Sequence, residues 1–184
     1  SGKVIVEVPG FMTAGNYTVH VDYNGNANYT STSAEENFTV AKADPVMAVD
    51  VQNITYGGVE YIIVNVKSSG NVTIKVNGTE TTIVLEEGPG GKAILRAIVN
   101  AIEQFNGKAT LEVHNLNAGE YPVEVTYNGN NNYKKATVKT TFFVTKDNVT
   151  VDVEVENIRV DGKEVINVTF SNTNVTGKVI INVD

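Results

Sequence analysis

Apolar and polar positions alternate with a period of two along most of the chain, which is the pattern of β-strands with one buried face. In residues 17–23, for example, Tyr17, Val19, Val21 and Tyr23 share one side. Similar runs occur at 46–51, 61–66, 71–76, 81–85, 108–113, 149–155 and 164–170. Short strands separated by turn residues predict an all-β fold of antiparallel β-sandwich type.

The strand pattern repeats along the chain at a fixed spacing. Residues 118–133 nearly copy residues 14–29 at an offset of 104 positions, and each copy contains an Asn-Gly dipeptide, at Asn24 and Asn128, where the chain must reverse. The same offset relates further pairs of segments: 38–42 with 142–146, and 49–54 with 153–158. Internal repetition at one offset predicts that a structural unit is reused along an array.

The repeat divides the chain into a half, a whole and a half module. Residues 44–147 are expected to form one complete module, residues 1–43 the C-terminal half of a preceding module, and residues 148–184 the N-terminal half of a following one. Two further matches extend the halves: 2–8 with 107–113, and 177–183 with 70–76. Half a sandwich leaves an apolar face and sheet edges without partners.

Two interpretations of the half modules stay open. In the first, the back half of one molecule receives the front half of the next, which gives a head-to-tail filament. In the second, the sequence is a piece of a longer array, and covalent neighbours complete each half.

One segment breaks the period-two pattern. Residues 92–105 carry apolar side chains at helical spacing, which predicts an amphipathic helix in an insertion at 88–106. Its apolar face either covers its own sandwich or docks on a partner protein. For docking, the candidate contact residues are Ile94, Ile98, Ile102 and Phe105.

The start of the repeated strand points to a known family. A tyrosine placed as Tyr17 and Tyr121 are, after a tight turn, can return its hydroxyl to the upstream backbone, as in the tyrosine corner of immunoglobulin-like domains. With the Ala-Gly-x-Tyr, Val-x-Val-x-Tyr-Asn-Gly-Asn and Phe-x-Val-x-Lys elements, the chain resembles the Ig-like (Big-type) repeats of bacterial and archaeal surface proteins, especially adhesin-like proteins of methanogenic archaea. This resemblance implies tandem immunoglobulin-like modules in extracellular stalks or adhesive arrays, without catalytic residues.

Composition narrows the functional classes. The formal net charge is −7 and the acidic side chains are scattered, which disfavours nucleic-acid binding. Cysteine is absent, so disulfides and thiolate chemistry are excluded, and no apolar run reaches the ~20 residues of a membrane span.

The two histidines, His20 and His114, lie at positions that are not equivalent in the repeat, and no nucleophile motif or phosphate loop accompanies them. We therefore expect neither an enzyme nor a cofactor.

A metal site is also not expected. Asp152, Glu154 and Glu156 alternate onto one strand face, where they could attract Ca²⁺. A solvated strand face is the preferred interpretation, because stacked carboxylates without loop carbonyls make a poor calcium cage.

Asparagine triplets point to an exported protein. Nine Asn-x-Ser/Thr triplets are potential N-glycosylation sites, although abundant Asn and Thr also produce such triplets by chance. The candidate asparagines are Asn16, Asn28, Asn37, Asn53, Asn71, Asn77, Asn148, Asn167 and Asn174.

These observations predict a non-enzymatic extracellular structural repeat protein. It would be a cell-surface stalk or filament subunit that assembles with itself, head to tail, by complementation of the terminal half modules. The alternative is an adhesin module that binds a host or partner-cell protein or glycan, with the 92–105 helix as its candidate contact surface.

Overall fold

The computed structural model describes residues 2–8, 10, 12–88, 92–96 and 108–184. In this part of the chain the fold is all-β, and thirteen strands form four sheets. In chain order the strands are β1 (Gly15–Tyr23), β2 (Thr32–Val40), β3 (Met47–Asp50), β4 (Ile54–Thr55), β5 (Glu60–Val66), β6 (Gly70–Val76), β7 (Thr79–Gly88), β8 (Lys92–Arg96), β9 (Lys108–Val113), β10 (Gly119–Tyr127), β11 (Ala136–Thr145), β12 (Val151–Glu154) and β13 (Asn167–Phe170).

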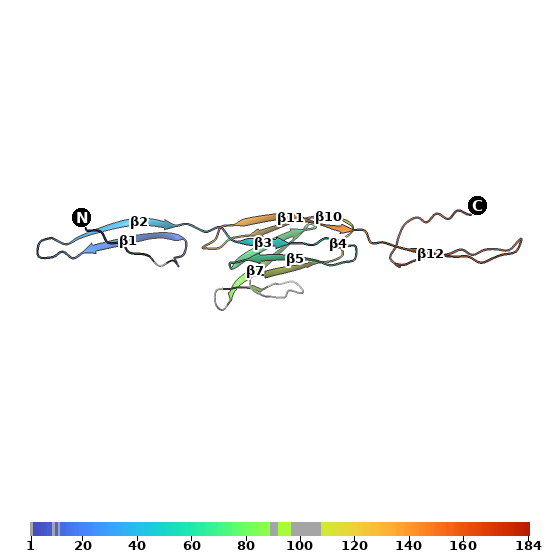
Figure 1. Cartoon of the computed structure of the whole chain (residues 1–184), viewed down its shortest axis with the longest axis horizontal. Helices are drawn as coiled ribbons and strands as arrows, with labels where there is room; N and C mark the ends of the chain where they lie inside the picture. Colours follow the sequence, from blue (N-terminus) through green and yellow to red (C-terminus); the bar gives the residue numbers. More distant parts are fainter. Residues whose placement is uncertain (1, 9, 11, 89–91, 97–107) are drawn as a thin grey trace.

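The molecule is elongated. A central β-sandwich formed by β3 to β11 lies between two hairpins, β1–β2 on one side and β12–β13 on the other, and all three follow the long axis (Figure 1). The two hairpins therefore lie at opposite ends of the sandwich.

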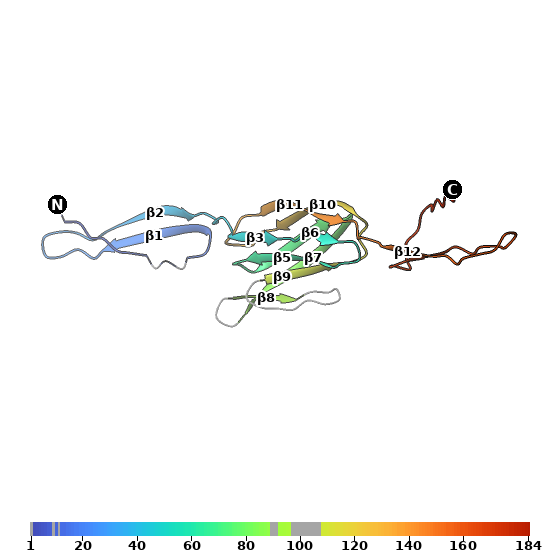
Figure 2. The same cartoon turned by 45° about the vertical axis from the view of Figure 1, so that its right-hand side comes forward.

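Two sheets form the central sandwich. Six strands are ordered β4-β11-β10-β6-β7-β8 in one sheet, and three are ordered β3-β5-β9 in the other (Figure 2). The ladders are antiparallel except between β4 and β11, where Ile54 pairs with Val144 in parallel. Because β3 and β4 belong to different sheets, the start of the module crosses from one sheet to the other.

The core lies between these two sheets and contains side chains from both. Its buried members are Ile62, Val64, Val66, Val72, Ile74, Val76, Ile83, Leu85, Leu116, Val123, Val125, Tyr127, Phe142 and Val144. Apart from Leu116, which lies between β9 and β10, they occupy alternate strand positions, as the period-two pattern requires. Each fully buried side chain of this size contributes about 1.5–3 kcal/mol relative to an exposed one.

The core tyrosine is accommodated by a specific polar contact. Tyr127 is fully buried, and its hydroxyl donates a hydrogen bond to the Ser69 carbonyl at 2.7 Å. Its ring also lies against Gly70, where an added Cβ would be 2.8 Å from Tyr127 Cε2. A glycine is therefore required at this position, both for space and because its φ is +138°.

The predicted helix is wrong over Lys92–Arg96, which forms β8. This strand pairs antiparallel with β7, with Gly88 opposite Lys92 and Glu86 opposite Ile94. A short apolar run does not distinguish helix from strand by periodicity alone, and the edge of β7 offers unpaired backbone groups. The rest of the predicted helix, including Ile98, Ile102 and Phe105, lies outside the described residues.

The chain reverses at the Asn-Gly dipeptides at positions 24–25 and 128–129, but not in a two-residue hairpin turn. Instead, each opens an eight-residue loop, 24–31 between β1 and β2 and 128–135 between β10 and β11. An Asn-Gly turn with positive φ at both residues occurs elsewhere, at Asn77 (49°) and Gly78 (72°), and joins β6 to β7.

Candidate assembly interface

The N-terminal hairpin has the same strand register as β10–β11. Gly15 pairs with Val40 at the start of β1–β2, and Gly119 pairs with Val144 at the start of β10–β11. All nine pairs of the two ladders correspond at the 104-residue offset. The repeat in the sequence is thus a repeat in backbone hydrogen bonding.

The tyrosine at the start of each hairpin makes the same backbone contact. The Tyr17 hydroxyl donates to the Thr13 carbonyl at 2.7 Å, and the Tyr121 hydroxyl donates to the Asn117 carbonyl at 2.9 Å. In both cases the acceptor lies four residues upstream, which is the geometry of a tyrosine corner. Each contact fixes the path of the chain as it enters the strand.

The eight-residue loops are also built alike. The Asn26 side-chain oxygen accepts from backbone N–H groups two and three residues later, at 2.8 and 3.0 Å. Asn130 does the same at 2.8 and 2.9 Å. The preceding glycines, Gly25 and Gly129, have φ values of 77° and 79°. Local sequence therefore determines this hairpin whether or not a second sheet covers it.

The C-terminal hairpin copies β3–β5. Met47 pairs with Val66 in the central module, and Val151 pairs with Phe170 in β12–β13, again at an offset of 104. All four pairs of these ladders correspond. The two hairpins thus correspond to strand ladders in different sheets of the central sandwich.

The β3–β5 unit and its C-terminal counterpart share a hydrogen bond from a backbone N–H to a glutamate side chain. The Gln52 N–H donates to Glu60 Oε1 at 2.7 Å, and the Glu156 N–H donates to Glu164 Oε1 at 2.6 Å. Glu60 is fully buried, whereas Glu164 is half-buried. Both copies therefore form the hydrogen bond although the surroundings differ.

The N-terminal hairpin differs from its counterpart, β10–β11, in how far its apolar side chains are exposed. In β10 three inward side chains are at most 1% exposed: Val123, Val125 and Tyr127. In β1 the equivalent side chains are open to solvent: Val19 (39%), Val21 (58%) and Tyr23 (43%). The same side chains in the same register form a core in one place and an uncovered apolar face in the other.

The aromatic stacking seen in the central sandwich is also present in the N-terminal hairpin, which no second sheet covers. The corner tyrosine stacks on Phe38 in the hairpin at a centroid distance of 5.5 Å, and on Phe142 in the module at 5.4 Å. Phe142 is fully buried, but Phe38 is only half-buried. The aromatic pair therefore prearranges the hairpin face before anything covers it.

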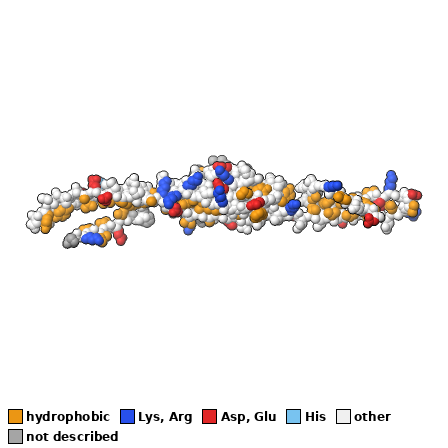
Figure 3. Space-filling model, turned by 90° about the horizontal axis from the view of Figure 1, so that it is seen from above, with side chains coloured by type: hydrophobic (Ala, Val, Ile, Leu, Met, Phe, Trp, Pro, Cys, Tyr) orange, Lys and Arg blue, Asp and Glu red, His pale blue; other side chains and the backbone are white. Residues whose placement is uncertain are grey.

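The C-terminal hairpin and the extended segments beside both hairpins are equally uncovered. Val151 and Val153 are 53% and 55% exposed on β12. Residues 2–8 and 177–183 are outside any strand, and their aliphatic side chains are exposed. Figure 3 shows orange apolar side chains along both outer parts of the molecule.

The first hairpin is joined to the pole of the sandwich by specific contacts. The Ala14 N–H donates to Asn132 Oδ1 at 3.0 Å, and the Ala43 N–H donates to the Asn132 carbonyl at 2.9 Å. Lys42 Nζ donates to the Asn130 carbonyl at 2.8 Å. Because these bonds anchor both strands of the hairpin to the 128–135 loop, they hold the hairpin in line with the module.

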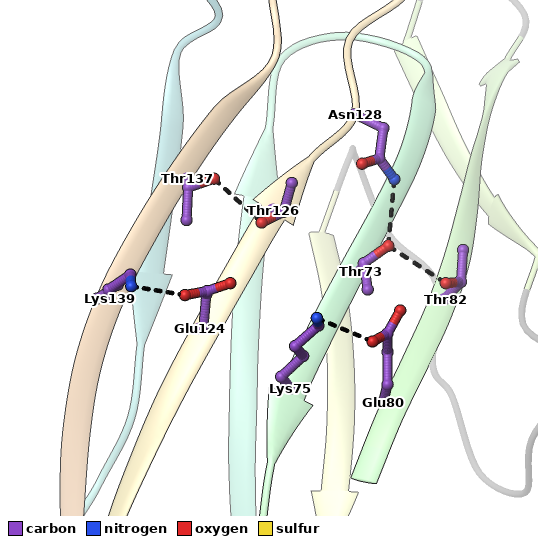
Figure 4. Close-up of polar contacts among 9 residues, drawn as sticks. All are labelled: Thr73, Lys75, Glu80, Thr82, Glu124, Thr126, Asn128, Thr137 and Lys139. Atoms are coloured by element: carbon purple, nitrogen blue, oxygen red, sulfur yellow. Dashed lines mark hydrogen bonds and ion pairs between the residues drawn. The ribbon is translucent and has the colours of Figure 1, made fainter. Parts of the chain in front are cut away.

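The outward face of the six-stranded sheet carries polar side chains that form hydrogen bonds and ion pairs with one another (Figure 4). Lys139 bonds to Glu124 at 2.8 Å, and this contact lowers the pKa of the Glu124 carboxyl. Lys75 bonds to Glu80 at 3.0 Å, which raises the pKa of the lysine. Threonine and asparagine side chains complete the ladder: Thr126–Thr137 (3.1 Å), Thr73–Thr82 (3.2 Å) and Asn128–Thr73 (3.1 Å). Such exposed cross-strand pairs stabilise the sheet weakly.

The potential glycosylation sites all lie at the surface. Every asparagine of the nine triplets is exposed: Asn16, Asn28, Asn37, Asn53, Asn71, Asn77, Asn148, Asn167 and Asn174. Three of them use their side-chain oxygen within the fold, because Asn16 accepts from Thr39, Asn37 from Thr18, and Asn53 from the Phe143 N–H. Glycosylation takes place at the amide nitrogen, so it leaves these acceptor oxygens in place.

The histidines do not converge on a common site. His20 pairs with Glu35 across β1–β2 at 2.8 Å, and His114 pairs with Glu112 at 3.2 Å, with both histidines exposed. Among the described residues, no three His, Asp or Glu side chains are placed to hold a metal ion. No helix in the described part of the chain is long and apolar enough to cross a membrane.

One buried acid, Glu60, was not predicted from the sequence. It is fully buried, Oε2 has no hydrogen-bond partner, and burial raises the pKa of this carboxyl. The Gln52 and Tyr61 backbone N–H groups and Asp50 affect the pKa less. A signal was available, because Glu60 stands in phase with Ile62 on the apolar face of its strand.

Comparison of the sequence with protein-family models gave no matching family, and comparison with curated proteins gave no match.

Proposed function

We propose that this chain is a non-enzymatic structural repeat unit of an extracellular array, a cell-surface stalk or filament. In this proposal the central sandwich is a complete immunoglobulin-like module, and each terminal hairpin is half of another such module. The observation that carries the proposal is the contrast between β1 and β10, which share register and side chains but not burial.

The two hairpins are complementary halves. β1–β2 corresponds to β10–β11, which lie in the six-stranded sheet, and β12–β13 corresponds to β3–β5, which lie in the three-stranded sheet. In the central module these two units pack against each other through the core. A β12–β13 hairpin therefore offers the type of surface that β1–β2 lacks, and the reverse holds as well.

The energetics favour covering these faces. Each large apolar side chain buried in such a contact contributes about 1.5–3 kcal/mol, and the polar face of the central sandwich offers no comparable gain. The side chains concerned include Val19, Val21, Tyr23, Val151 and Val153. Association also costs translational and rotational freedom, but a preformed hairpin has already lost most of its backbone entropy.

The in-line arrangement suits a mechanical role. The hairpins lie at opposite ends of the sandwich, so modules completed at both ends continue along one axis (Figure 1). Exposed Asn-x-Ser/Thr triplets on all three parts support an extracellular location.

Light scattering after size-exclusion chromatography, with electron microscopy, tests the proposal on the purified 184-residue chain. We expect oligomers that lengthen with concentration and appear as thin filaments. Val21→Asp should abolish them by placing a charge on the uncovered face. Val84→Asp is the matched control, since Val84 is also exposed (40%) but lies on β7 of the central module. A monodisperse monomer at all concentrations would contradict the proposal.

A second candidate function is ligand binding by an adhesin module. An open hollow of about 670 Å³ lies beside β10 where β6 ends, and its lining includes Lys75, Tyr121 and Lys139. Lysine ammonium groups can donate hydrogen bonds to sugar hydroxyl groups, and an aromatic ring offers an apolar surface to a sugar ring. Screening of the chain against a glycan array, with Lys139→Ala as the comparison, tests this candidate: binding that the variant loses supports it, and no binding argues against it.

A further inference from the structure

We propose that the partner of each hairpin is a second copy of this chain, joined through two intermolecular strand ladders whose registers are those of the central module. In one ladder residues 177–183 of the first copy pair with β1 of the second. In the other, residues 2–8 of the second copy pair with the strand that contains β13 of the first. This inference rests on the proposed structural function and specifies its contact.

The first ladder follows from the pairing of β10 with β6. In the module Val123 pairs with Val76 and Tyr127 pairs with Val72. β1 replaces β10 at the 104-residue offset, and residues 177–183 repeat the glycine and the alternation of residues 70–76. The corresponding intermolecular pairs are Val19 with Val183 and Tyr23 with Val179.

The second ladder follows from the pairing of β5 with β9. In the module Ile62 pairs with Leu111 and Glu60 pairs with Val113. The counterparts of β5 are residues 164–170, and those of β9 are residues 3–8. The corresponding intermolecular pairs are Ile166 with Val6 and Glu164 with Val8. Residues 2–8 are available for this pairing, because Val4, Val6 and Val8 are between 55% and 88% exposed.

A glycine provides independent support for the first ladder. Gly70 has φ +138° and lies against the Tyr127 ring, so its conformation fits a packed tyrosine. Gly177 has φ +148°, yet a Cβ added there would meet nothing within 4 Å. The C-terminal segment thus has the backbone of the glycine site without the ring that fills it. In the joined module, Tyr23 of the second copy supplies that ring.

The loop before Gly177 shows how far the correspondence extends. Gly177 follows Gly70 by 107 residues rather than 104, because residues 171–176 form a longer loop than residues 67–69. The register of this ladder is therefore set by the glycine and the strand that follows it. The difference in loop length changes the end of the joined module and not the pairing within the ladder.

The partner is a second copy rather than the other end of the same chain. The β1–β2 and β12–β13 hairpins are separated by the full length of the central sandwich (Figures 1 and 2). Each copy therefore offers one half at each end. Because the two surfaces are different, the contact propagates from copy to copy instead of closing as a two-fold dimer.

Introduced cysteines test the register directly, since the chain contains none. His20 and Asn182 are the counterparts of Glu124 and Lys75, which are directly opposite each other on the outward face of the sheet. Side chains in this relation have Cβ atoms about 4.5–5.5 Å apart, close enough for a disulfide after slight adjustment. We expect His20→Cys with Asn182→Cys, after mild oxidation, to give a ladder of covalent multimers on a non-reducing gel.

Two matched controls define the expected result. His20→Cys with Ile180→Cys displaces the second cysteine by two residues on the same face, where the Cβ atoms are about 7–8 Å apart, and should give few multimers. A single His20→Cys variant can form covalent dimers at most. Circular dichroism should match that of the unsubstituted chain in every case.

The outcomes separate the register from assembly itself. A covalent ladder only with the matched pair supports the proposed register. If the unsubstituted chain forms filaments but the matched pair links no better than the displaced pair, the register is wrong and the structural function stands. If the unsubstituted chain forms no assemblies, both proposals are overturned.

Discussion

At the residue scale, the buried carboxyl of Glu60 makes the stability of the central module depend on pH. One oxygen accepts from the Gln52 N–H at 2.7 Å, and the other has no hydrogen-bond partner. Burial raises the pKa of this group above its ordinary value of 4.5. The folded chain therefore keeps a proton over a pH range in which the unfolded chain loses it. The stability that this group contributes is complete below pH 4.5 and is lost as the pH rises through the folded-state pKa.

Glu60→Gln should stabilise the module at neutral pH. The amide oxygen can still accept from Gln52, but no charge has to be buried. We expect a gain of about 1 kcal/mol at pH 7, because a buried charged group with an unsatisfied oxygen costs more than a neutral one. The melting temperature of the variant should also decline less as the pH rises above 4.5. Thermal denaturation followed by circular dichroism measures both. Glu164→Gln is the control, because its half-buried carboxyl lies outside the central module; an equal effect there would contradict this explanation.

The corner tyrosines allow a second comparison at this scale. Tyr121→Phe removes the hydroxyl that donates to Asn117 at 2.9 Å and should lower the free energy of unfolding by about 1 kcal/mol. Tyr17→Phe removes the equivalent bond to Thr13, but in an uncovered hairpin. It should therefore leave the main unfolding transition in urea unchanged. Equal losses from both variants would show that the hairpin and the module unfold as one unit.

At the element scale, alternation located the strands of the sandwich well. The predicted runs 61–66, 71–76 and 108–113 coincide with β5, β6 and β9 to within a residue, because one face of each strand is buried. The period-two pattern did not identify β8, whose conformation depends on pairing with a neighbouring strand. Lys92–Arg96 is a strand because it pairs with β7, and its own sequence is equally compatible with a helix.

The candidate interface was predictable only in part. The repeat offset identified both hairpins, since register depends on local sequence and pairs of adjacent strands. The offset did not identify Glu60, because it relates whole segments to one another; the burial of Glu60 was indicated instead by its phase with Ile62 on the apolar face of the strand. Nor could the offset reveal the unfilled glycine site at Gly177, which depends on backbone dihedral angles.

A pair of glycine variants tests whether the two glycine sites act as the structure indicates. Gly70→Ala should destabilise the central module by at least about 2 kcal/mol, because the new Cβ would be 2.8 Å from the Tyr127 ring and the φ is +138°. Gly177→Ala meets no atom within 4 Å and should leave that transition unchanged. It should nevertheless weaken assembly, as measured by light scattering. Unchanged assembly would contradict the role of Gly177 at the contact.

At the scale of the whole molecule, the distribution of charge and apolar surface determines how assembly responds to salt. Residues 2–43 contain four acidic and two basic side chains, and residues 148–184 contain six acidic and three basic ones. Both ends are therefore net negative, while the faces that would meet are apolar. Repulsion between like ends opposes an association that burial of apolar surface favours.

Added salt should consequently strengthen assembly. Between about 0.01 M and 1 M salt the Debye length falls from about 30 Å to about 3 Å, so repulsion between the ends is screened while the apolar contact persists. Sedimentation velocity should show larger species at high salt at the same protein concentration. Val21→Asp should remain monomeric under both conditions, because its added charge lies on the face that has to be buried. Dissociation at high salt would instead mean that ion pairs hold the copies together, and the apolar hairpin faces would then not be the contact.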